Sequence, residues 1–178
     1  RFSTSGGGIE EVARTDSAGR AMATLTTAQP LPEDGWVVVS AQTQGAGGAV
    51  LRAQMQVLFS GPTSISLIQP ARFEVAPGAA QTFLFFVGDH HGHPLAAGTR
   101  IRVEAAGGRA SGQTDLTLPD TQAPEATLFS VSFQAEEAGE VPRLTITVAS
   151  PNGDAQASFV SGAMPAASSG VPASLSVA

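Results

Sequence analysis

Apolar and polar residues alternate with a period of two along much of this chain. The clearest run lies at 50–59 and places five apolar residues on one side: Leu51, Ala53, Met55, Val57 and Phe59. Arginine and glutamine occupy the intervening positions 52, 54 and 56. Since successive side chains of a strand point to opposite faces, the run predicts a β-strand with one face turned to a core.

Further strands are predicted along the rest of the chain, at 20–27, 36–43, 63–68, 72–76, 80–88, 100–103, 111–118, 129–133, 144–148 and 154–161. Turn sequences separate them, among them Pro-Glu-Asp-Gly at 32–35 and Pro-Asn-Gly-Asp at 151–154. Short strands at this spacing, without a helical period, are typical of antiparallel β-sandwiches. We therefore expect an all-β protein.

Two pairs of similar segments indicate internal sequence repeats. Residues 59–67 return as 168–177 with one residue inserted before the proline, and residues 1–7 match 102–108 in charge, alternation and glycine pair. A repeat of about 110 residues has the size of an immunoglobulin-like sandwich. The predicted fold is therefore a tandem series of such sandwiches.

The positions of these repeats also predict the domain boundaries. Residues 1–61 would be the C-terminal part of one sandwich without its N-terminal strands, and 62–162 a complete sandwich. Residues 163–171 are small and uncharged and are expected to form a linker, followed at 172–178 by the first strand of a further module or by a donated strand. Half a sandwich exposes its core face, so a longer protein or another polypeptide would have to complete 1–61.

Composition narrows the classes of function. The net charge is −6, lysine is absent and the nine arginines are scattered, so the sequence does not favour binding to nucleic acid or to an anionic membrane surface. Cysteine is absent, which excludes disulfides and thiolate metal sites. No apolar run approaches the roughly 20 residues of a membrane span, so we expect no direct membrane insertion.

Two turn sequences resemble a known family. They are Thr-Asp-Ser-Ala-Gly-Arg-Ala at 15–21 and Val-Gly-Asp-His-His-Gly-His-Pro-Leu at 87–95. These are similar to the "T-D-x-x-G-x-A" and "V-x-D-x-x-G-x-P-L" turns of bacterial immunoglobulin-like modules of the Big-1, invasin and intimin type. The second repeat lacks the first motif. The resemblance implies a non-enzymatic role in rods of tandem modules on surface or secreted proteins.

The turn at 89–93 carries the only metal-ligating chemistry of the sequence. His90, His91 and His93 lie beside Asp89, and neutral imidazoles with a carboxylate could bind Zn²⁺, Ni²⁺ or Cu²⁺. The alternative is an ordinary β-turn, in which Gly92 supplies a positive φ, Asp89 bonds its own backbone and the histidines face solvent. No cofactor is expected.

Three apolar residues are predicted to face away from a core. Phe83, Phe85 and Val87 would fill the core, which leaves Leu84 and Phe86 on the outer side of the strand at 80–88, and Trp36 starts a strand that is apolar on both sides. Outward aromatic residues are candidates for contact with a protein or a glycan. A neighbouring module or loop that covers them is the alternative.

The sequence contains no Gly-x-Ser-x-Gly elbow and no phosphate-binding loop, so we do not expect an enzyme. We expect a structural or interaction segment of a bacterial cell-surface or extracellular protein: an adhesin spacer, or a filament or envelope-assembly subunit. Its partners would be neighbouring modules or copies of itself, with a glycan or a host or envelope protein also open. The alternative function is a carbohydrate-binding or accessory module of a secreted enzyme, although one Trp and no Tyr suit it poorly.

Overall fold

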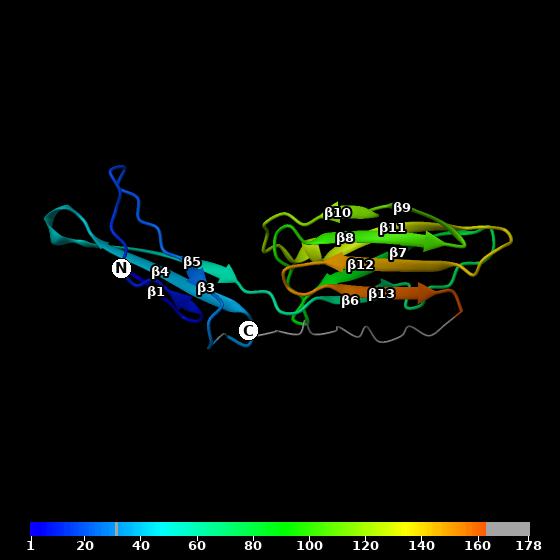
Figure 1. Ribbon diagram of the computed structural model, residues 1–178, viewed down its shortest axis with the longest axis horizontal. Coiled ribbons are helices and arrows are strands. Elements are labelled where there is room, and N and C mark those ends of the chain that lie inside the picture. Colours follow the sequence, from blue (N-terminus) through cyan, green and yellow to red (C-terminus); the bar gives the residue numbers. More distant parts are fainter. Residues whose placement is uncertain (31, 163–178) are drawn as a thin grey trace, which may run out of the picture. The chain divides into compact units, whose positions relative to one another are not determined.

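The computed structural model describes residues 1–30 and 32–162. These residues form two compact units, unit 1 at Arg1–Phe59 and unit 2 from Ser60 onward (Figure 1). In this part of the chain every strand pair is antiparallel and the helices are two short 3-10 turns, which confirms the all-β expectation. Within the described ranges no helix is long and apolar enough to span a bilayer. The linker and strand predicted at 163–171 and 172–178 lie outside the described residues.

Unit 2 is a sandwich of two four-stranded sheets, ordered β6-β7-β11-β9 and β10-β8-β12-β13. This is the constant-type immunoglobulin arrangement with β10 added beside β8. A short 3-10 helix, η2 (Pro124–Thr127), precedes β11. The strands are β6 (Ser64–Gln69), β7 (Ala80–Gly88), β8 (Arg100–Ala106), β9 (Gly108–Gly112), β10 (Asp115–Thr117), β11 (Leu128–Ala135), β12 (Arg143–Ala149) and β13 (Ala155–Val160).

The core of unit 2 follows the alternation of its strands. The predicted inward residues of β7, β8, β11 and β12 are all buried: Phe83, Phe85, Val87, Ile101, Val103, Phe129, Val131, Phe133, Leu144, Ile146 and Val148. Phe85 lies at the centre. Its ring centroid is 5.7 Å from that of Phe129 in its own sheet and 5.2 Å from that of Phe159 on β13 in the opposite sheet.

Unit 1 contains a three-stranded sheet, β1-β4-β5, and a two-stranded sheet, β2-β3. The 3-10 helix η1 (Ala46–Gly48) joins the two long strands. The strands are β1 (Phe2–Thr4), β2 (Gly8–Ile9), β3 (Leu25–Thr26), β4 (Trp36–Gln44) and β5 (Val50–Leu58).

The five strands of unit 1 repeat a pairing scheme of unit 2. In unit 1, β1 pairs with β4 and β4 with β5, just as β8 pairs with β12 and β12 with β13. Likewise β2 pairs with β3 as β9 pairs with β11. Within the described residues, β6, β7 and β10 have no counterpart in unit 1.

The alternation at 50–59 predicts a core face, but the structure leaves most of that face open. Leu51 and Met55 are 57% and 62% exposed. Among the described residues of unit 1, Val37 is the only buried hydrophobic residue. The pattern correctly gives the side of β5 on which the apolar residues stand, whereas it does not show that another layer covers them.

The strand predicted at 72–76 is wrong. No residue there pairs in a sheet, although Phe73 and Val75 are 3% and 8% exposed and belong to the core. The backbone N–H of Val75 donates to the Ser161 hydroxyl at 3.2 Å instead of to a strand. Pro70 and Pro77 flank the segment and cannot donate to a ladder.

Two other predicted strands are only partly right. At 111–118 there are two strands, because Gly112, with φ of 93°, turns the chain from β9 in one sheet to β10 in the other. At 20–27 only Leu25–Thr26 pairs. The Arg20 N–H instead donates to the Asp16 carboxylate at 2.9 Å, which closes a turn.

We predict that Phe85→Ala destabilises unit 2 by about 3–5 kcal/mol, because it leaves a cavity at the contact between the two sheets. Chemical denaturation followed by circular dichroism would measure the free energy of unfolding. The matched control is Leu128→Ala on the neighbouring strand, where the side chain is 45% exposed. Equal losses for the two variants would contradict a core centred on Phe85.

Candidate functional site

The turn between β7 and β8 is organised by a buried carboxylate. Asp89 is 1% exposed, and its Oδ1 accepts hydrogen bonds from the backbone N–H groups of His91 at 2.9 Å and His93 at 2.8 Å. Gly92 has φ of 86°, a conformation that suits glycine. The structure therefore has the predicted β-turn, with Asp89 bonded to nearby backbone N–H groups and a positive φ at Gly92.

The other oxygen of this carboxylate reaches the first residues of unit 2. Asp89 Oδ2 accepts from the Gly61 N–H at 2.8 Å and lies 3.2 Å from His93 Nδ1. A Cβ on Gly61 would lie 3.2 Å from the His90 ring, so the backbone approaches the turn closely because residue 61 is glycine. The Asp89 carboxylate thus hydrogen-bonds Gly61 to a turn that is distant in the sequence.

The electrostatics of Asp89 follow from this environment. Burial alone would raise the pKa of its carboxyl group. Hydrogen bonds from the backbone N–H groups of Gly61, His93 and His91 outweigh that effect and, with the nearby His93, hold the pKa below its ordinary value of 3.8. The carboxylate is therefore ionised at neutral pH.

The three histidines occupy different surroundings. His90 and His91 are exposed with ring centroids 3.8 Å apart, whereas the His93 side chain is 18% exposed and faces Asp89. The centroids of His91 and His93 are 5.9 Å apart. In the described part of the chain, no group of three or more His, Cys, Asp or Glu side chains is arranged to hold a metal ion. Metal binding by His90, His91 and His93 stays a prediction.

A second polar network, which no sequence motif predicts, lies beside this turn. Asn152 accepts from the Ala96 N–H and donates to the Ser60 carbonyl, each at 2.8 Å. The Ser60 hydroxyl in turn donates to the Pro94 carbonyl at 2.5 Å. The sequence marks 151–154 as a turn, but its link to residue 60 arises only from the fold.

The candidate contact residues lie on the outer face of β7 and at the start of β4. Leu84 and Phe86 are both half-buried, and Phe86 is the direct cross-strand partner of Leu128 on β11. A Cβ on Gly88 would come within 2.7 Å of the Phe86 ring, so this ring lies along the glycine. Trp36 is half-buried and pairs with Leu58. Leu84 and Phe86 of unit 2 form one candidate contact site, and Trp36 of unit 1 is a separate candidate.

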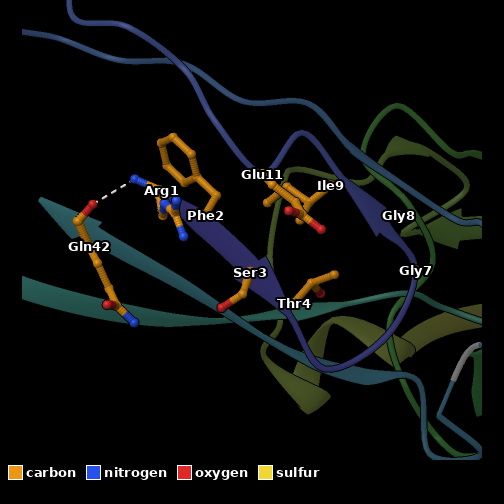
Figure 2. Close-up of a pocket in the computed structure, with 9 residues that line it drawn as sticks. All are labelled: Arg1, Phe2, Ser3, Thr4, Gly7, Gly8, Ile9, Glu11 and Gln42. Atoms are coloured by element: carbon orange, nitrogen blue, oxygen red, sulfur yellow. Dashed lines mark hydrogen bonds between the residues drawn. The ribbon is translucent and has the colours of Figure 1, made fainter.

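Unit 1 has a half-open hollow of about 590 Å³ beside β1. Figure 2 shows Phe2, Ser3 and Thr4 along this strand, with Ile9 and Glu11 on the segment that follows it. The amino group of Arg1 donates to the Gln42 carbonyl at 2.7 Å. Its lining combines polar residues, among them Ser3, Glu11 and Gln42, with the apolar Phe2 and Ile9.

Comparison with known proteins shows similarity only to solved structures. No protein-family model matches the chain. No curated protein matches it. Among solved structures it is similar to "Structure of Yersinia pseudotuberculosis adhesin InvE", with 14% identity and a TM-score of 0.38. The alignment covers 92% of this chain and 48% of that one, so the chain spans about half the length of that structure.

We predict that Asp89→Asn lowers the free energy of unfolding of unit 2 at neutral pH by about 1–3 kcal/mol, because three backbone donors lose a charged acceptor. Since folding lowers the pKa of Asp89, its stabilisation is present above 3.8 and is lost as the pH falls through the folded-state pKa. The difference between wild type and variant should therefore shrink on acidification.

Chemical denaturation from neutral pH to below 3.8 would measure that difference. The control is Asp115→Asn, whose side chain is 67% exposed and lies 3.6 Å from Arg102. We expect the control to change stability by less than about 0.5 kcal/mol. A pH-independent difference between Asp89→Asn and wild type would contradict the role assigned to the buried charge.

Proposed function

We propose that this chain is a non-enzymatic structural and interaction segment of a bacterial cell-surface or extracellular protein, built from consecutive immunoglobulin-like sandwiches. The observation that carries the proposal is the repetition of one pairing scheme in both units. Repeated modules of this size extend a polypeptide by regular steps and present equivalent faces along it. The turns at 15–21 and 87–95, with their resemblance to surface-protein modules, support the same function.

The outer strand faces suit a solvated spacer. The Thr82 and Ser132 hydroxyls lie 2.8 Å apart across β7 and β11, and those of Thr145 and Ser158 lie 3.1 Å apart across β12 and β13. Such cross-strand hydroxyl pairs stabilise a sheet while keeping its outer side polar. Within unit 2, the aromatic core and the hydrogen bonds to Ser60 and Gly61 would keep the module itself rigid.

The outer apolar residues supply the interaction side of the proposal. Leu84, Phe86 and Leu128 interrupt the polar outer face of the sheet that contains β7. Leu128 is 45% exposed, and Ile68 on the neighbouring β6 is 49% exposed. Apolar residues on neighbouring strands of one sheet fit contact with a neighbouring module or a second copy, and Trp36 would be a similar contact point on unit 1.

We predict that antibodies raised against the purified chain label intact cells of the source organism, or the surrounding medium, because the segment is exported. External protease should remove the cell label without releasing a cytoplasmic marker protein, which serves as the control. Antigen detected only after lysis would refute the proposed location. Immunofluorescence before and after protease treatment measures both outcomes.

We predict that the double variant Leu84→Ser, Phe86→Ser weakens self-association of the chain about ten-fold, because it removes apolar area from a protein contact. Sedimentation velocity over a concentration series would measure the association constant. The matched control is Val141→Ser, since Val141 is 54% exposed but lies in the turn between β11 and β12. Unchanged folding and association in the double variant would rule out this contact face.

A further inference from the structure

The two units can be compared position by position because their sheets share a register. In unit 1, Phe2 pairs with Ala41 and Ala41 with Ala53. In unit 2, Val103 pairs with Ile146 and Ile146 with Ala157. Continuing along the ladders, Val39 pairs with Met55 as Leu144 pairs with Phe159, so Met55 is the counterpart of Phe159.

Equivalent positions have opposite exposure. Phe159 is 6% exposed and Met55 is 62% exposed, although both stand on the same side of the last strand of equivalent sheets. The ring centroid of Phe85 on β7 lies 5.2 Å from that of Phe159. The residue that covers this position in unit 2 therefore belongs to a strand that has no counterpart among the described residues of unit 1.

The side of the sheet β1-β4-β5 that carries Met55 is buried at Val37 but open farther along the strands. This open part, here called the open face, includes Phe2, Ala41, Leu51, Ala53 and Met55. A hollow of about 350 Å³ lies over part of it. Residues of the segment between β2 and β3, among them Ala13 and Gly19, line the other side of this hollow. These small side chains leave the space above the open face unfilled.

In the part of the chain that the structure describes, the second sheet of unit 1, β2-β3, also has no strand at the position that β7 occupies in unit 2. In unit 2, β11 lies between β9 and β7, with seven residue pairs joining it to β7. In the described residues of unit 1, the counterpart strand β3 pairs with β2 alone. The edge of β3 therefore has the position at which a β7-like strand would form its ladder.

We propose that the open face receives an antiparallel strand pair with the chemistry of β6 and β7, connected to β1 as β7 is connected to β8. The pair carries large apolar side chains at alternate positions, so that a residue like Phe85 covers Met55, as Phe85 covers Phe159 in unit 2. Its second strand extends the sheet β2-β3 along β3. This inference concerns the folding of unit 1 and does not depend on where the protein is located.

The test compares the full chain with the same chain extended before Arg1 by a copy of its own residues 62–101. Hydrogen exchange measured by mass spectrometry follows the amides of β4 and β5. We expect exchange in these strands to slow by about ten-fold or more in the extended protein, because a covered sheet opens less often. A matched extension that carries Phe83→Ser and Phe85→Ser in the appended copy only should give no protection.

A second pair of variants tests the open face itself within the extended protein. Leu51→Ser with Met55→Ser should abolish the protection, because these residues would receive the appended strands. Gln54→Ser with Gln56→Ser should retain it, because these residues alternate with the open-face residues and Gln54 lies on the opposite face, where its Nε2 donates to the Ser40 hydroxyl at 3.0 Å. Loss of protection in both pairs would overturn the proposal, since the effect would then not be specific to the open face.

Two further outcomes would also overturn the proposal. One is exchange in β4 and β5 of the unextended chain that is already as slow as in β12 and β13. The other is a dimer of the unextended chain that Leu51→Ser with Met55→Ser dissociates, because the occupant would then be a second copy. These readouts use purified protein, so failure here is distinguishable from failure of the localisation experiment.

Discussion

The contact between β7 and the opposite sheet is the interaction on which the sandwich depends. Phe85 contacts Phe129 in its own sheet and Phe159 across the core, so one strand joins the two layers. Where β7 is present, the apolar faces of both sheets are buried. The described residues of unit 1 repeat the facing sheet without that strand, and Leu51 and Met55 remain exposed to solvent. The difference in burial between the two units thus follows from the layer of side chains that β7 supplies.

Polar interactions determine where β7 ends and how it connects to the rest of unit 2. Asp89 follows β7 directly and uses its buried carboxylate to hold both its own turn and Gly61. An ionised group with several backbone donors can be buried without being left unpaired. The aromatic core and this turn are therefore complementary, because the core packs the strand and the carboxylate fixes its exit.

Sequence reasoning predicted the parts of the fold that depend on local pattern. Alternation placed Phe85, Ile101 and Leu144 in the core, and turn chemistry gave Asp89 and Gly92 their roles. It failed at 72–76, where Val75 bonds to a side chain hydroxyl instead of a strand, because periodicity does not reveal the hydrogen-bond partner. The link between Asn152 and Ser60 was not predictable for the same reason, since it joins residues far apart in the chain.

The open face shows most clearly what a pattern can and cannot specify. Leu51 and Met55 alternate with polar residues as regularly as the buried residues of unit 2 do, so the sequence defines a face meant for burial. Burial itself is a relation between two layers, and one strand encodes only its own side of it. Because apolar surface is costly to leave in water, the persistence of the pattern on β5 is physical evidence for a covering layer. The chemistry of that layer can be read from β7, which covers the equivalent face in the same chain.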